Sequence, residues 1–271
     1  MEYTITICIV NFNSSEFVLN TLYCLDKITK NTYKVIIRDN NSKLQDFLNL
    51  KKNVEDRSNV ELYRAENFNH IGSIAHGLAI NDLLKKINSK YGVILDADCT
   101  FLIKNWDEIL LNEINDEYPI IGTQAPSLSD KPQDFPLMFA ILFDAKIMKQ
   151  LNINFMPKNI EEFQDTGYEL RKKYIAEGYK SKLLLDRNTR VYKLGPFKSL
   201  ICVEYYFKDY KHIFASHFGR GSTLGLNKYL RTNNRKFYQI PVIGAYLLKK
   251  KGKKEKEEWI SICKNIVKDQ I

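Results

Sequence analysis

The chain has 271 residues, of which 44% are hydrophobic and 12% aromatic, so it can bury a substantial core and is not a disordered chain. Its 41 Lys and Arg against 32 Asp and Glu give a net charge of +9, which favours polyanionic partners: nucleic acid, an acidic membrane surface or phosphorylated small molecules. The five cysteines are scattered without a CxxC pair, which argues against a disulfide framework or a cysteine-rich zinc site and favours a reducing compartment.

The first residues lead directly into a strand pattern, without the basic segment of a signal peptide. No apolar run approaches the ~20 residues that a membrane-spanning helix needs. We therefore expect a cytoplasmic protein, either soluble or resting on the inner face of the membrane.

Residues 1–125 alternate short β-branched runs with segments of helical period, which predicts an α/β fold with a mostly parallel sheet flanked by helices. Strands are expected at 4–10, 33–38, 60–64 and 91–95. Helices are expected from the polar cap at 13–16 to about 25, at 71–87 and at 106–114.

The second half is less regular. Residues 115–136 contain four prolines and predict a loop around a short strand at 120–121. A strand is expected at 137–143, with Asp144 capping the next helix, then a helix at 164–177, β-structure at 190–207 and a basic, mainly helical end. Without a glycine- or serine-rich linker, we expect one domain at 1–225, with halves at 1–125 and 126–225, and a C-terminal extension at 226–271.

Polar clusters follow four predicted strands, at 11–13, 39–41, 66–69 and 96–98. In an open parallel sheet, ligands bind beyond the carboxyl ends of the strands. Each cluster alone is typical of a turn, but the four together predict a binding site at one edge of the sheet.

Asp96-Ala97-Asp98 is the sharpest of these clusters because it directly follows the apolar run Tyr-Gly-Val-Ile-Leu. Two carboxylates separated by one residue can offer oxygen ligands to Mg²⁺ or Mn²⁺. The cation would bridge diphosphate oxygens and neutralise the charge on a departing nucleotide.

These motifs resemble those of the family 2 glycosyltransferases, which have the Rossmann-like GT-A fold. The resemblance is carried by Val10-Asn11-Phe12-Asn13, by the Arg-Asp-Asn-Asn-Ser string around Asp39, by Asn67 followed by Gly72-Ser73, and by the DxD strand. It covers residues 3–115 well and 136–220 more loosely. It implies an inverting enzyme that uses a nucleotide-sugar donor, with 1–125 binding the donor and 126–225 the acceptor.

The resemblance also implies roles for single residues. Val10, Asn11 and Asn13 would line the nucleoside pocket, and Asp39 would hydrogen-bond the base. Asn67, Gly72 and Ser73 would lie near the ribose and diphosphate, Asp96, with Ala97 beside it, would contact the ribose or sugar, and Asp98 would hold the metal.

The acceptor half contains a second acidic candidate. Asp165 precedes a predicted helix at the place where the family carries a Glu-Asp string, although Gln164 replaces the usual Glu. An inverting transferase needs a base to deprotonate the acceptor hydroxyl, and we assign that role to Asp165. The alternative is that Asp165 only stabilises the helix dipole. Glu161 and Glu162 are neighbouring acids that could serve as the base in its place.

His217 falls where many proteins of this fold carry a late metal-binding histidine, and imidazole is a suitable Mn²⁺ ligand beside carboxylates. Arg220, in the Gly-Arg-Gly-Ser that follows, could counter the diphosphate charge. We interpret His70, His76 and His212 as structural.

The basic run Lys249–Lys256 follows an apolar stretch and is either a solvated tail or a contact with anionic lipid. We expect a UDP-sugar donor, a saccharide or lipid-linked acceptor, and no nucleic-acid partner. A nucleotidyltransferase is the alternative enzyme, but no glycine-rich phosphate loop follows the first strand. A noncatalytic nucleic-acid- or lipid-binding protein is the remaining alternative, since it would need only the basic excess.

Overall fold

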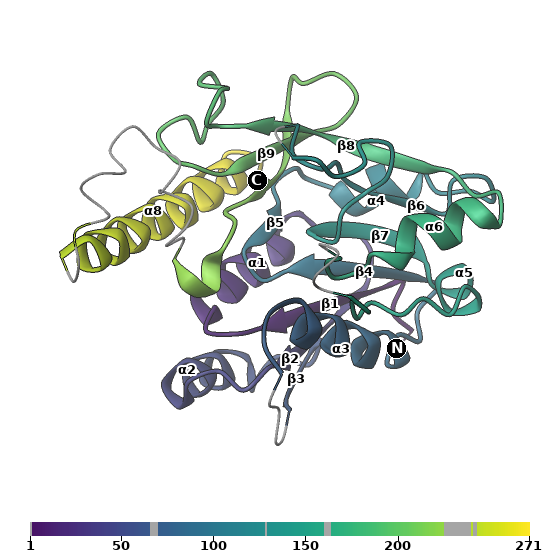
Figure 1. Ribbon diagram of the computed structural model, residues 1–271, viewed down its shortest axis with the longest axis horizontal. Helices are drawn as coiled ribbons and strands as arrows, with labels where there is room; N and C mark the ends of the chain where they lie inside the picture. Colours follow the sequence, from purple (N-terminus) through teal and green to yellow (C-terminus); the bar gives the residue numbers. More distant parts are fainter. Residues whose placement is uncertain (1, 66–69, 128, 160–163, 225–239, 241–242) are drawn as a thin grey trace.

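The computed structural model describes residues 2–65, 70–127, 129–159, 164–224, 240 and 243–271 (Figure 1). The strands are β1 (Ile5–Asn11), β2 (Tyr33–Asp39), β3 (Val60–Arg64), β4 (Tyr91–Asp96), β5 (Cys99–Phe101), β6 (Ile120–Thr123), β7 (Ala140–Asp144), β8 (Ser181–Asn188), β9 (Val203–Tyr206) and β10 (Ile213–His217). The helices are α1 (Ser15–Ile28), α2 (Leu44–Val54), α3 (Gly72–Lys85), α4 (Trp106–Leu111), α5 (Ala145–Gln150), α6 (Glu169–Ala176) and α8 (Ile243–Lys268), with a short 3-10 turn at Gly221–Thr223.

The strands form one mixed sheet in the order β3-β2-β1-β4-β7-β6-β8-β9-β10-β5. Strands β3, β2, β1 and β4 are parallel to one another, so their carboxyl ends meet at one edge. At that edge Val10 pairs with Asp96, and Asn11 pairs with Asp39. The register therefore brings three of the predicted polar strand ends together.

The other half of the sheet is mainly antiparallel. Strand β7 pairs antiparallel with β4 and β6, and β8, β9, β10 and β5 form an antiparallel series. Strand β5 begins one residue after Asp98, and its Cys99 pairs with His217 of β10. This pairing carries His217, far away in the sequence, to the DxD turn.

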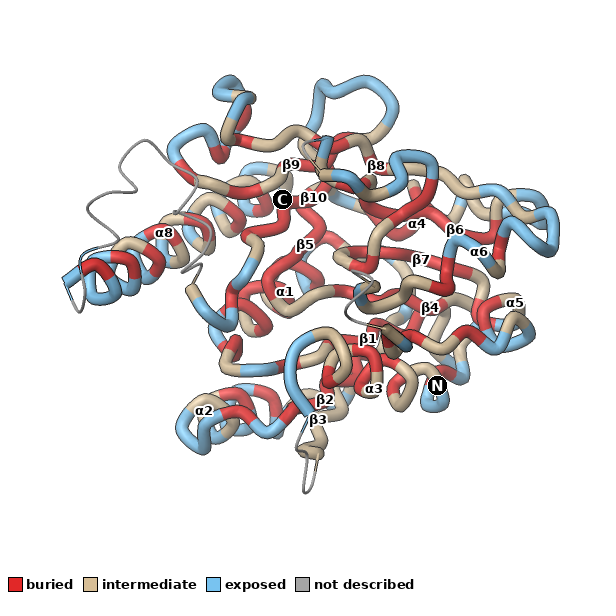
Figure 2. Tube along the Cα trace, viewed as in Figure 1, coloured by how far each residue is buried: buried red, intermediate tan, exposed pale blue. Residues whose placement is uncertain are grey.

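Buried residues line the sheet and the helices that cover both of its faces (Figure 2). The alternation of side chains along β1 divides them between two cores. Ile5, Ile7 and Ile9 face the larger core with α1, α2, α4 and α8, whereas Cys8 faces the smaller core with α3, α5 and α6. This is the α/β arrangement with flanking helices that the sequence predicts, and it is confirmed.

Helix α8 packs along α1 and closes the larger core. Its buried positions recur every three or four residues, which is the spacing of one helix face: Gly244, Leu248, Gly252, Glu255, Trp259, Cys263 and Val267. The helix predicted for the C-terminal residues is therefore confirmed. The second half of α8 is an integral part of the larger core. None of the helices in the described part of the chain is both long enough and apolar enough to cross a membrane.

Several predicted elements differ from the structure. The helix expected at 164–177 begins only at Glu169, because Asp165–Tyr168 form turns with Gly167 at positive φ. The β-structure expected at 190–207 is wrong for most of its length, since a Gly-Pro turn interrupts it at 195–196 and only β9 is a strand. Strands β5, β8 and β10 were not predicted.

The N-cap expected at Asp144 is confirmed, since its carboxylate accepts hydrogen bonds from the backbone N–H groups of Lys146 and Ile147 at 2.9 and 3.0 Å. The four N-terminal strands are also confirmed within one or two residues at each end.

Candidate active site

Asp96, Asp98 and His217 form a cluster at the carboxyl edge of the sheet. One possible ligand atom from each lies within 4.8 Å of the others. The Nε2 atom of His217 is 3.3 Å from Oδ1 of Asp98 and 3.8 Å from Oδ2 of Asp96. Two carboxylates and an imidazole are a suitable donor set for a divalent cation.

The backbone holds this cluster in place from two directions. Asp98 accepts a 2.8 Å hydrogen bond on Oδ2 from the N–H of Gly221, and its carbonyl accepts a 2.9 Å hydrogen bond from the N–H of Phe218. A Cβ added to Gly221 would lie 2.8 Å from Cβ of Asp98, so only glycine allows this approach. The ring of His217 packs on Phe139 with 4.2 Å between centroids.

Asp96 has an unusual environment. The pKa of its carboxyl is raised to about 6, chiefly by burial; the nearby His76 and His217 act to lower the pKa, and the charges of Asp98 and Asp165 act to raise it. Among the described residues its buried Oδ1 has no hydrogen-bond partner, and Nε2 of His76 lies 3.6 Å away. A buried carboxylate oxygen without a donor fits a site that a cation or a ligand hydroxyl completes. The cluster could therefore hold a divalent metal ion.

The cluster opens into a cavity of about 900 Å³. Its wall combines the ends of β1 and β4, the first turns of α3, the segment before α6 and the loop after β10. A volume of this size accommodates a nucleotide-sized ligand.

Asp165 lines this cavity from the segment before α6. Its carboxylate accepts hydrogen bonds from the hydroxyl of Ser73 at 2.6 Å and from Nζ of Lys131 at 2.7 Å. Burial raises the pKa of the Asp165 carboxyl. Lys131 and Ser73 together lower the pKa by more than burial raises it, so it lies below its ordinary value. The group is therefore ionised at neutral pH and able to accept a proton.

Most of the predicted site residues line the cavity: Val10, Gly72, Ser73, Asp96, Ala97, Asp98, Asp165, His217 and Arg220. Asn11, Asn13 and Asp39 are not part of its wall. Asn67 and the substitutes Glu161 and Glu162 lie outside the described residues.

Asn11 and Asp39 lie behind the wall in a buried network. The side-chain amide of Asn11 donates to Oδ2 of Asp39 at 2.9 Å, to Ser42 at 3.1 Å and to Asp46 at 3.1 Å. Both residues have no exposed surface. In this arrangement they hold the turns after β1 and β2 together, and their contact with a nucleoside stays a prediction.

Three further cavity residues were not assigned to the site from the sequence, and the interpretation of His76 as structural is wrong because it lines the cavity. His76 lies on α3 beside Asp96, Lys131 pairs with Asp165, and the ring of Phe12 is 47% exposed at the cavity. Phe12 follows the predicted strand end and could have been found from that position. Lys131 belongs to a loop with no pattern that would connect it to Asp165.

Residues 6–178 match the model of glycosyl transferase family 2. The chain belongs to this family. Comparison with curated proteins found no match.

Several solved structures share the fold at low sequence identity. A mannosyltransferase from Pyrobaculum calidifontis, PcManGT in complex with GDP-Man and Mn²⁺, aligns with a TM-score of 0.53 at 12% identity over 68% of this chain and 57% of its own. S. aureus TarS 1-349 aligns with a TM-score of 0.51 at 13% identity over the whole chain and 83% of its own.

GalNAc-T7, solved with UDP, GalNAc and Mn²⁺, aligns with a TM-score of 0.51 at 15% identity over 68% of this chain and 42% of its own. The chain thus spans only about half the length of several structures that it matches. The family match places this chain among the family 2 glycosyltransferases, and the structural matches confirm the GT-A fold.

Proposed function

We propose that this glycosyltransferase moves a sugar from a nucleotide-sugar donor, a UDP-sugar, to a hydroxyl of a saccharide or lipid-linked acceptor, with inversion at the anomeric carbon. The observation that carries the proposal is the cluster of Asp96, Asp98 and His217 at the wall of a nucleotide-sized cavity.

Asp98 and His217 would hold a divalent cation, with Asp96 oriented by the two histidines beside it. When bound, the cation neutralises the charge of the diphosphate as it departs. An imidazole beside carboxylates favours Mn²⁺ over Mg²⁺, which prefers oxygen ligands alone. The PcManGT and GalNAc-T7 complexes, which contain Mn²⁺, support this choice.

The nucleoside end of the donor would lie near the exposed ring of Phe12 at the end of β1, where an apolar face is available for a base to stack on. GalNAc-T7 and TarS 1-349 have been solved with UDP, which supports a uridine donor, whereas PcManGT has been solved with GDP-Man. Arg220 lines the same cavity and could pair with the diphosphate.

Asp165 would act as the base. Its carboxylate takes the proton of the acceptor hydroxyl while the hydroxyl oxygen bonds to the anomeric carbon. The bond from that carbon to the diphosphate breaks on the opposite face, and the electron pair leaves with the phosphate oxygen. Lys131 and Ser73 fix the orientation of the carboxylate through the hydrogen bonds described above.

Asp98→Asn tests the metal site because it removes one charge and keeps the size of the side chain. A thermal-shift screen should show that uridine diphosphate with Mn²⁺ stabilises the native protein, since a ligand that binds only the folded state raises the melting temperature. The Asn variant should lose this stabilisation. Undiminished Mn²⁺-dependent binding by the variant would refute the assignment.

A further inference from the structure

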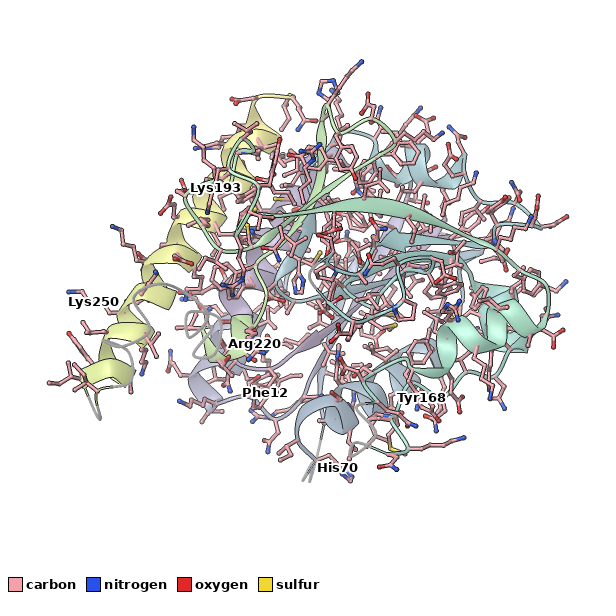
Figure 3. All side chains as sticks on the ribbon, turned by 45° about the horizontal axis from the view of Figure 1, so that its top comes forward. Phe12, His70, Tyr168, Lys193, Arg220 and Lys250 are labelled. Carbon is pink, nitrogen blue, oxygen red and sulfur yellow. The ribbon has the colours of Figure 1, made fainter. Side chains whose placement is uncertain are left out.

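The first half of α8 carries apolar and basic side chains on the side that faces away from the protein. We call this surface the α8 outer face. Its members are Ile243, Tyr246, Leu247, Lys250, Lys253 and Lys254, all of them exposed. Ile243 is 57% and Tyr246 67% exposed, although large apolar side chains usually lie inside. Figure 3 shows Lys250 on the side of α8 away from the body of the molecule.

No ion pair among the described residues neutralises the outward-facing lysines of this surface. Residues 243–254 contain five lysines and no acid. Elsewhere lysines commonly pair with carboxylates, as Lys86 does with Glu61 at 2.9 Å. In the described part of the chain no carboxylate forms an ion pair with Lys250, Lys253 or Lys254; on this helix the pairs involve Lys251 and Lys256.

A second segment of the same character lies beside α8. The loop 189–202 between β8 and β9 exposes Val191 by 68% and Leu194 by 85%, next to the exposed Lys193. The loop is attached to α8 by a 2.6 Å hydrogen bond from Ser199 to Glu258. Figure 3 shows Lys193 and Lys250 toward the same side of the molecule.

We propose that the α8 outer face, together with this loop, docks on a membrane surface that contains anionic lipid. Lysines near such a surface are attracted by the lipid phosphates, and apolar side chains among them enter the boundary between headgroups and acyl chains. A soluble polyanion would use the lysines but would leave Ile243, Tyr246 and Leu194 in water. The mixture of exposed apolar and unpaired basic side chains therefore fits lipid better than nucleic acid or an acidic polysaccharide.

The docking surface is connected to the catalytic cavity. A Cβ added to Gly252 of α8 would lie 2.2 Å from the carbonyl oxygen of Leu224, so the helix rests directly on the end of the loop after β10. That loop lines the cavity and donates the Gly221 hydrogen bond to Asp98. A docked α8 would place the cavity near lipid headgroups. Resting on the proposed function, this selects the lipid-linked acceptor over a free saccharide.

Vesicle co-sedimentation of the full chain tests the proposal without donor or metal. The protein should bind phosphatidylcholine vesicles that contain phosphatidylglycerol, bind pure phosphatidylcholine far less, and bind less as salt is raised. K250E/K253E/K254E should weaken binding by at least about tenfold, because each basic residue near an anionic surface contributes on the order of a fivefold factor. The control K51E/K52E/K172E makes the same change of charge at exposed lysines outside α8 and should bind like the unmodified protein.

I243S/Y246S tests the apolar contribution to docking. At high salt, where charge attraction is screened, this variant should bind vesicles more weakly than the unmodified protein. Equal binding of both charge variants would overturn the proposal. So would binding of polyphosphate or single-stranded DNA as tight as vesicle binding and unaffected by I243S/Y246S, which would assign the surface to a soluble polyanion. Loss of a dimer in I243S/Y246S by light scattering, without loss of vesicle binding, would also overturn it. Donor hydrolysis, measured separately, should be unchanged in all these variants, so failure of docking is distinct from failure of the proposed chemistry.

Discussion

The imidazoles of His76 and His217 lie on two sides of Asp96, and each approaches a different carboxylate oxygen. The oxygen near His76, Oδ1, is buried and accepts no hydrogen bond from the described residues. The sequence predicted Asp96, Asp98 and His217 for different reasons. The two acids follow an apolar strand, whereas His217 was assigned from resemblance, and only the pairing of β10 with β5 places it beside Asp98.

His217→Gln should weaken Mn²⁺ binding by at least about tenfold, because it removes one of the two side chains proposed to hold the cation. Isothermal titration with Mn²⁺ measures the change. His212→Gln, at an exposed turn just before β10, is the matched control and should leave Mn²⁺ affinity unaltered. Equal affinity in both variants would show that His217 is not a ligand.

Asp165→Asn should lower kcat by about 10²–10⁴-fold, with little change in donor affinity, because the amide cannot take a proton from the acceptor. Asp134→Asn is the control, since Asp134 also pairs with a basic residue, Arg171, but lies outside the cavity wall. Steady-state transfer kinetics distinguish them. A normal kcat for Asp165→Asn would show that Asp165 is not the base and that another residue of 126–225 takes the proton.

Helix α6 begins later than its periodicity predicts, and this changes the meaning of its acids. Asp165 lies in the turn before the helix, so it is not an acid of the first turn, and that position is occupied by Glu169. Glu169 accepts hydrogen bonds from the N–H of Asn154 at 3.1 Å and from the hydroxyl of Tyr168 at 2.9 Å. The sequence could not show this, because Gly167 adopts positive φ and breaks a pattern that is otherwise helical.

Glu169 should make stability depend on pH. Burial raises the pKa of its carboxyl, but Lys158, Asn154, Tyr168 and Lys173 outweigh this and lower the pKa to about 2. A lowered pKa stabilises the fold above the ordinary value of 4.5, and this contribution is lost as the pH falls from 4.5 toward 2. Because Lys158 is exposed and screened by solvent, we expect on the order of 2 kcal/mol at pH 7.

Urea unfolding of Glu169→Gln at pH 7 and at acidic pH measures this contribution. The free energy of unfolding should be lower than that of the unmodified protein at pH 7, and the difference should shrink as the pH approaches 3. A difference independent of pH would show that the lost contacts are steric and not ionic.

The larger core joins residues from both ends of the chain. Phe17 of α1 packs against Trp259 of α8 with 5.6 Å between ring centroids and against Phe218 at 5.0 Å. The parallel half of the fold could be predicted because each β-branched run is followed by a helical segment nearby in sequence. The antiparallel half depends on pairings such as that of β5 with β10, which no local pattern records.

The reactivity of the buried cysteines can be used to follow the opening of the two cores. All five are buried, and burial raises the pKa of Cys263 and Cys99 well above the ordinary value. In the native protein the thiols should be unreactive toward a disulfide reagent over the time in which the unfolded chain reacts completely. Mass spectrometry of alkylated peptides measures each site.

Trp259→Ala should expose Cys263 and Cys24 first, because it removes the largest side chain between α8 and α1, at a cost of about 3–5 kcal/mol. Cys8, in the smaller core, serves as the internal reference. Labelling of Cys8 at the same rate as Cys263 would show that the two cores open together.

The packing of α8 also determines how late in translation the chain can complete its fold. Helix α1 and the DxD strand leave the ribosome early, but the part of α1 that packs against α8 is covered only when Trp259 and Val267 arrive. The loop whose amide binds Asp98 is supported from behind by the same helix. A nascent chain should therefore keep part of α1 exposed to chaperones, and the loop at Asp98 unsupported, until translation has passed α8.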